Sequence, residues 1–248
     1  MPTSAQRMST GATAETARHA RTSERTRYFA RQIVSAADLT VDQDYFRNKL
    51  RRHNRYLHGW GIVCGALVKE AADPWTVLIA PGYILGPYGD EIHIETSRCF
   101  DIRSGSIERV TGGECEGTPD PWCSEAPRPV RADQPVYIAV RYREYQARPV
   151  RVDSCGCGCQ ELPCEYSRWR DGYEVRALDQ LPATHENPPA NEPAVSGPPP
   201  ECPGCPDDPW VVLAKVTADA DGTLTIDMNG VRRQVKAWGS FWWRPTIP

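Results

Sequence analysis

The chain has 248 residues and a mass of 27.7 kDa, enough for one large β domain or two smaller ones. Its 23 Pro and 19 Gly predict many turns and exclude an all-helical fold. A net charge of -3 gives no reason to expect nucleic-acid binding, which usually rests on a basic surface. No stretch approaches the roughly 20 apolar residues of a membrane-spanning helix, so we expect no membrane insertion.

Residues 1–27 are rich in Ser, Thr, Ala and Arg, and they lack the apolar centre of a secretory signal. Glu15 and Glu24 argue against an organelle transit peptide, which is poor in acidic residues. We therefore expect a flexible or partner-bound arm.

An amphipathic helix is predicted within residues 28–61. Thr40 and Gln43 have the spacing of a capping box, so the helix should begin there and run from Val41 to about Leu57. Gly59 and Gly61 should end it. Apolar residues recur at helical spacing along one side: Phe46, Leu50 and Leu57.

The other sides of this helix are strongly basic. A charge run of this kind is more often a solvated face than a docking surface, and docking onto an acidic partner is the second interpretation. The candidate interface residues here are Arg47, Arg51, Arg52 and Arg55.

Alternating apolar residues and turn signals predict a mainly β protein, with an antiparallel β-sandwich or barrel-like body. Residues 62–151 should form a β-rich domain with a loop insertion at 104–133. A Cys- and Pro-rich insertion should follow at 152–208, and residues 209–248 should form a closing hairpin and an aromatic tail. The predicted strands are 62–68, 75–80, 91–95, 135–145, 210–218 and 223–227.

Six of the ten cysteines lie in the second insertion. A long loop without an apolar core needs cross-links to hold one conformation, and either metal ligation or disulfides could supply them. Cys202 and Cys205 have the CxxC spacing of two thiolates on one tetrahedral ion. We favour a structural Zn²⁺ site over disulfides, with ligands from Cys155, Cys157, Cys159, Cys164, Cys202 and Cys205.

The remaining cysteines are interpreted differently. Cys115 and Cys123 lie close together in the first insertion, and we favour a disulfide between them. Cys64 and Cys99 stand beside apolar strand residues, so both are expected to be free, small, buried hydrophobic side chains.

Catalytic motifs are absent from the sequence: it contains no HExxH, no GxSxG, no GxxxxGK[ST] and no GxGxxG. The carboxylates are scattered, and no His lies beside the thiols 155–164 as a metal-dependent hydrolase would require. We therefore expect a protein that is not an enzyme.

The last eleven residues are unusually aromatic. A tail of this composition should pack on its own β body or in a groove of a neighbouring subunit, because aromatic residues anchor interfaces. The candidate interface residues are Trp238, Phe241, Trp242 and Trp243.

Several segments resemble a family of phage-tail-like proteins found in contractile injection system and tail gene clusters. The resemblance includes the stretch at residues 51–65, is specific in its RRHNRYLHGWG segment, residues 51–61, and spans roughly Tyr28 to Val175. The other matching segments are 39–46, 80–83, 88–92, 164–168 and 171–174.

The resemblance implies a baseplate, fibre-attachment or accessory subunit that assembles with other subunits of a tail-like particle, as a homo-oligomer around the particle axis. It implies synthesis and assembly in the cytoplasm, with an extracellular location after release left open. It transfers no catalytic residue. The alternative function is an adaptor that binds a target or a carbohydrate through the metal-stabilised insertion.

Overall fold

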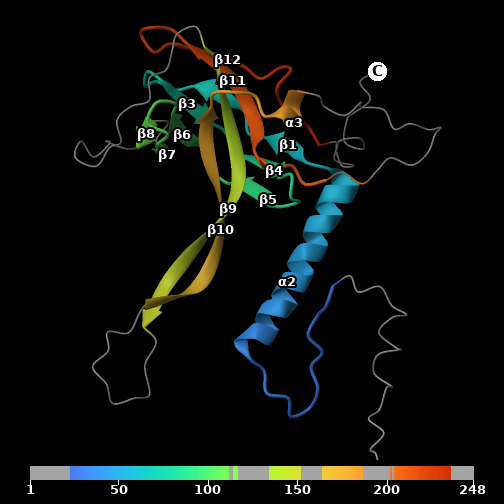
Figure 1. Cartoon of the computed structure of the whole chain (residues 1–248). Helices are drawn as coiled ribbons and strands as arrows, with labels where there is room; N and C mark the ends of the chain where they lie inside the picture. The colour runs from blue at the N-terminus through green and yellow to red at the C-terminus, as the bar shows by residue number, and fades with distance from the viewer. Residues whose placement is uncertain are drawn as a thin grey trace, which may run out of the picture. The chain divides into compact units, whose positions relative to one another are not determined.

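The computed structural model describes residues 23–111, 114–116, 134–151, 164–186, 202 and 204–235 (Figure 1). The chain divides into two compact units, Met1–Leu50 and Arg51–Pro248. Each unit is described by itself. In the described residues, no helix is both long and apolar enough to cross a membrane.

The first unit contains most of helix α2 (Ala36–His53), which begins four residues before the predicted capping box. Ser35 and Asp38 form the cap instead: the Ser35 N–H donates to Asp38 Oδ2 at 2.9 Å, and the Asp38 N–H donates to Ser35 Oγ at 3.2 Å. Thr40 lies inside the helix and donates its hydroxyl to the Ala36 carbonyl. The predicted start was wrong because two overlapping sequences satisfy the same capping pattern.

The helix continues into the second unit and changes its winding. A π-helical turn, η1 (Asn54–His58), follows α2, and Gly59 ends it with a φ of +74°. The predicted end at Gly59 is confirmed, because a residue without Cβ adopts this backbone most easily.

In the part of the chain that the structure describes, twelve strands form three sheets and pair antiparallel within each sheet, so the mainly β prediction is confirmed. The sheet orders are β1-β4-β5, β2-β3-β6-β7-β8 and β10-β9-β11-β12. The strands are β1 (Gly61–Gly65), β2 (Val68–Glu70), β3 (Thr76–Ile79), β4 (Gly82–Leu85), β5 (Glu91–Ile94), β6 (Arg98–Asp101), β7 (Ile107–Thr111), β8 (Glu114–Glu116), β9 (Val136–Arg151), β10 (Cys164–Leu178), β11 (Val211–Ala218) and β12 (Leu224–Asp227).

One apolar core joins the three sheets. It contains side chains from each of them that are almost fully buried, among them Ile84, Phe100, Ile138 and Leu213. Burial of each such side chain stabilises the fold by about 1.5–3 kcal/mol before entropy is counted. The three sheets therefore form one body around a common interior.

The central strand β11 is buried on both faces, which explains its nearly continuous apolar sequence. Val211 and Leu213 face the main core, and Val212 packs in a smaller cluster with Ala139 and Trp210. The short helix α3 (Ala183–Glu186) supplies His185, which bonds to Val212 of this second cluster.

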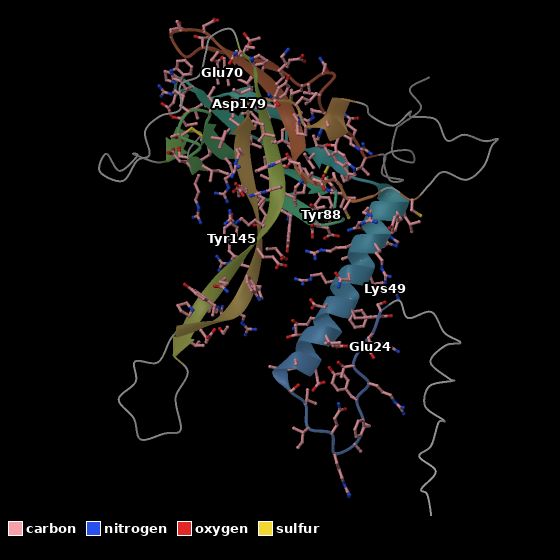
Figure 2. All side chains as sticks on the ribbon, viewed as in Figure 1. Glu24, Lys49, Glu70, Tyr88, Tyr145 and Asp179 are labelled. Carbon is pink, nitrogen blue, oxygen red and sulfur yellow. A yellow bond between two sulfur atoms is a disulfide. The ribbon has the colours of Figure 1, made fainter. Side chains whose placement is uncertain are left out.

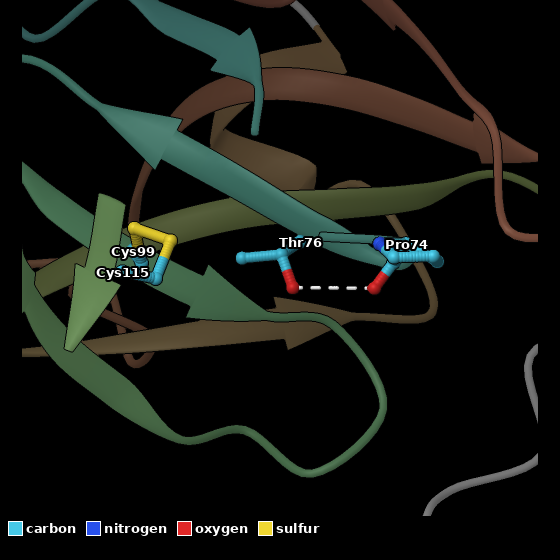
Figure 3. The surroundings of a disulfide bond; sticks show 4 residues. All are labelled: Pro74, Thr76, Cys99 and Cys115. Carbon is cyan, nitrogen blue, oxygen red and sulfur yellow. Dashed lines mark hydrogen bonds between the residues drawn. A yellow bond between two sulfur atoms is a disulfide. The ribbon is translucent and has the colours of Figure 1, made fainter. Parts of the chain in front are cut away.

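Two cysteine predictions were wrong. The structure pairs Cys115 with Cys99 rather than with Cys123, with a Cα–Cα distance of 5.8 Å (Figure 3). The path of β6, β7 and β8 brings the two together, and proximity in sequence gave no indication of it. Cys99 is buried as expected but bonded, and Cys123 lies outside the described residues.

Cys64 is exposed and free rather than buried. The register of β1 against β4 shifts between Ile62 and Cys64, which marks a β-bulge or a similar irregularity. Ile62 is buried, and regular alternation would place Cys64 on the same face. The irregularity breaks this alternation.

A tight junction joins the start of the second unit to the turn before β5. Arg51 Nε lies 2.5 Å from Asp90 Oδ1, and buried Asn54 donates from Nδ2 to the Gly89 carbonyl at 3.0 Å. Gly89 has a φ of +87°, and a Cβ there would collide with the Arg51 carbonyl oxygen. Two of the segments that carry the family resemblance therefore contact each other here.

Replacing Gly89 with Ala should destabilise the body strongly, because the new Cβ would force the turn away from Arg51. Gly105→Ala is the matched control, since Gly105 also has positive φ (+72°) but open space around it. In the control, the free energy of unfolding should fall only by the backbone cost of about 1–2 kcal/mol. In Gly89→Ala it should fall by at least about 1 kcal/mol more. Equal losses in urea unfolding would contradict the close contact.

His185 connects α3 to the body. Its side chain is 5% exposed, and its Nε2 accepts the Val212 N–H at 3.1 Å. The ring also packs edge-on against Trp60, and the Arg233 guanidinium lies 4.0 Å from the centroid of the Trp60 ring. Burial, and secondarily the charge of Arg233, lower the pKa of His185 to about 4.

A histidine with a lowered pKa makes folding dependent on pH. The unfolded chain binds a proton near the ordinary pKa of 6.5 and the folded chain only near 4, so stability should fall as pH decreases through this window. His185→Gln, which keeps an acceptor for Val212, should flatten the dependence of the free energy of unfolding on pH across that window. An unchanged slope would show that His185 does not titrate as described.

Candidate functional site

The β9–β10 hairpin forms both a wall of the body and an arm that leaves it (Figure 1). Its strands pair continuously from Tyr137 with Leu178 to Arg151 with Cys164. One pair of the ladder, between Arg148 and Ser167, is missing, and we call this position the missing rung. Near the closed core, Val136, Ile138 and Val140 are buried, and β11 pairs with β9 along residues 136–140. We define the arm as residues 143–150 of β9 and 165–172 of β10.

No residue of the arm is buried. Four large apolar or aromatic side chains are exposed on it, and Trp169, at 66% exposure, is the most open. Along the arm, the described residues show β9 and β10 paired only with each other. A two-stranded hairpin of this kind is marginally stable in water by itself. The exposed side chains are Tyr145, Val150, Tyr166 and Trp169.

The missing rung lies near the far end of the arm. Arg148 has a φ of +56°, and its carbonyl accepts the Ser167 hydroxyl at 3.0 Å instead of a ladder bond. The next residue, Pro149, has no N–H to donate. Both features reduce regular edge pairing, in the way that natural proteins protect exposed strands from aggregation.

An ion-pair network fixes the arm where it leaves the body. Arg141 donates from Nε and Nη2 to Glu174 Oε2 at 2.9 and 2.7 Å, and Arg176 donates to Oε1 at 2.6 Å. Both guanidinium groups also lie over the Trp210 ring. Burial alone would raise the pKa of Glu174, but the bonds and charge of Arg141, then of Arg176, outweigh it and lower the pKa.

Tyrosines complete the base of the arm, and Figure 2 labels Tyr145 among them. The Tyr145 ring covers Gly172, where a Cβ would lie 2.6 Å from the ring, and its hydroxyl donates to the Tyr173 carbonyl at 3.2 Å. The Tyr142 hydroxyl lies 2.6 Å from Asp171 Oδ1. Burial, and then the bond to Asp171, raise the pKa of Tyr142. The side chains at the base are therefore held by contacts across the two strands.

A cleft of about 820 Å³ lies between this base and the strands β4 to β7. Three tyrosines and both signs of charge line it, without a group of three or more potential metal ligands among the described residues. Burial, and then a bond to Glu91, raise the pKa of Tyr83 in this cleft to about 12. The lining residues are Tyr83, Glu91, His93, Glu95, Arg98, Ile107, Arg109, Tyr145, Arg170, Asp171, Gly172 and Tyr173.

The predicted zinc ligands lie mostly outside what the structure describes. Cys155, Cys157 and Cys159 are outside the described residues, and only the backbone of Cys164 is described, at the start of β10. Cys202 and Cys205 are exposed and free. The Zn²⁺ site therefore stays a prediction.

The predicted interface arginines behave differently from one another. Arg51 makes the internal ion pair with Asp90, so it supports the fold rather than an open docking face. Arg47 pairs with Asp44 at 2.7 Å on the helix surface, and Arg55 lies 2.5 Å from the Cys205 sulfur. Arg52 is exposed.

The aromatic tail also lies outside the described residues, as do residues 1–22 of the N-terminal arm predicted at 1–27. Nothing therefore tests the roles predicted for Trp238, Phe241, Trp242, Trp243 or residues 1–22. The apolar stripe of α2 is described, and it is exposed: the helix contains no buried residue.

No protein-family model matches the chain, and no curated protein does. Solved structures with similarity to this chain include a type VI secretion system TssK-TssF-TssG baseplate subcomplex (11% identity, TM-score 0.40), TssK (9%, 0.41) and the type VI secretion system baseplate complex (13%, 0.39).

The similarities cover 83%, 82% and 82% of this chain, but only 60%, 40% and 40% of the three matched chains. The chain thus spans less than two thirds of the length of each. TM-scores this low do not establish a common fold, so the function has to be argued from the chain's own surfaces.

Proposed function

We propose that the protein is a non-enzymatic structural subunit whose β9–β10 arm docks onto other subunits of a phage-tail-like contractile particle. The observation that carries the proposal is the arm itself: a paired ribbon that leaves the core with no buried residue and four large exposed side chains. The resemblance of residues 51–65 to tail-associated proteins is the reason for proposing that the partners are subunits of such a particle. Copies would also associate with one another around the particle.

The energetics favour a docking role for the arm. An ordered ribbon outside the core costs conformational entropy for every residue, and little of its own apolar surface is buried in return. Exposed Trp and Tyr side chains are the residue types that most often dominate binding energy once a partner covers them. The Glu174 network holds the arm in place at its base, which reduces the ordering cost of docking.

Replacing Tyr166 and Trp169 together with Ser should weaken assembly at least about tenfold, because two aromatic anchors are lost. The test is co-expression with the proteins of the same gene cluster, followed by sedimentation of the purified complexes. The body should unfold at the same urea concentration as the native protein, since neither side chain contributes to its core.

Leu67→Ser is the matched control, because Leu67 is an exposed apolar residue of the body, at 45%. It should leave assembly unchanged. If the Tyr166 and Trp169 double variant assembles as well as this control, the arm is not the docking element.

A second candidate function is favoured by the cleft at the base of the arm. Ligand sites combine aromatic surfaces with a few charged groups, and this cleft places Tyr83, Tyr145 and Tyr173 among arginines and carboxylates. Flat sugar faces pack on such rings while hydroxyls bond to the charged groups. The protein would then act as an adaptor that binds a carbohydrate target.

Tyr145→Ala should abolish binding to an array of bacterial surface oligosaccharides if the adaptor function is correct, because it removes one wall of the cleft. Trp169→Ser is the control, since Trp169 does not line the cleft, and it should bind like the native protein. Absence of binding by the native protein would contradict the adaptor function and leave the docking proposal intact.

A further inference from the structure

Two histidines meet at the π-helical turn. His53 is the last residue of α2 and His58 the last of η1, and their Nε2 atoms lie 3.2 Å apart. The ring centroids are 5.1 Å apart, and the ring planes are inclined by 57°. Neither side chain is buried, so solvent and ions can reach the pair.

The change of winding explains why the two rings meet. Residues five apart do not share a face of a regular α-helix, where neighbours are three or four apart. A π-helical turn takes more residues per turn and forms hydrogen bonds between residues five apart, and such turns are frequent at functional sites. The segment 54–58 therefore brings together two imidazoles that an uninterrupted α-helix would separate.

We propose that His53 and His58 form a two-histidine half-site for a divalent cation of the zinc class. Zn²⁺ binds imidazole nitrogen at about 2.0–2.1 Å in tetrahedral geometry, which places two bound nitrogens about 3.3 Å from each other. The observed separation of 3.2 Å needs almost no adjustment. A direct N–H···N hydrogen bond between neutral rings would give a similar distance, so the two arrangements must be separated by experiment.

The surrounding charges affect how tightly the two histidines would bind a cation. Arg51 precedes the pair in sequence and Arg55 lies between the two histidines, but Arg51 is paired with Asp90 and Arg55 lies at the Cys205 sulfur. Basic neighbours weaken cation binding, and two ligands hold an ion less tightly than four. The remaining coordination positions stay open to water or to a donor from another chain. This half-site uses none of the six thiols that were predicted to bind zinc.

The test follows the histidine ring nitrogens by NMR in the full-length, ¹⁵N-labelled protein while Zn²⁺ is added. The Nε2 resonances of His53 and His58 should move together, and His58→Ala should reduce the affinity at His53 at least tenfold. His93→Ala is the control, since His93 is an exposed histidine on β5, and it should change nothing at the pair.

Two results would overturn the proposal. Zn²⁺ could leave both rings unmoved, which would mean that the rings share only a hydrogen bond and that any bound metal sits at the thiols. Alternatively, His53 could respond equally well in the His58→Ala variant, which would mean that the two histidines do not share an ion. Neither variant alters a buried side chain, and circular dichroism verifies that they fold.

Discussion

The ladder between β9 and β10 is the interaction on which the rest of the structure depends, because the same two strands serve two different environments. At one end, residues 136–140 are held between β10 and β11 and contribute to the core shared by all three sheets. At the other end, the strands continue outside that core with only each other as partners among the described residues. The hydrogen-bonded register transmits the rigidity of the body into the arm.

Side chains at the base of the arm separate these environments. Glu174 lies in β10 between buried Val175 and the exposed arm, and its three arginine partners make the charged carboxylate favourable there. Tyr145 covers Gly172 on the adjacent strand, which replaces packing that a glycine cannot provide. The cleft is a consequence of the same arrangement, since the arm diverges from β4 to β7 at this point.

Periodicity in the sequence predicted much of the fold. Alternation along β5 and β9, the apolar run of β11 and the glycine at the end of the helix each reflect local physical rules, and these features are confirmed. The helix start was wrong because Ser35 and Asp38 satisfy the same local rule as Thr40 and Gln43. Local patterns cannot choose between two valid caps.

Features that depend on distant pairing were out of reach. The Cys99–Cys115 disulfide depends on the course of β6, β7 and β8. The cleft combines residues that lie far apart in the sequence, between positions 83 and 173. The bulge that turns Cys64 outward has no clear sequence signal. The His53–His58 contact requires a π-helical turn, which the helical period of the sequence argues against.

Hydrogen–deuterium exchange along β9 and β10, measured on the free protein and on the assembled particle, tests the docking role most directly. The account predicts slow exchange at residues 136–140 in both states, because the core already protects them. It predicts faster exchange at residues 145–150 and 165–170 in the free protein and strong protection after assembly. Unchanged exchange along the arm in the assembled particle would contradict the account.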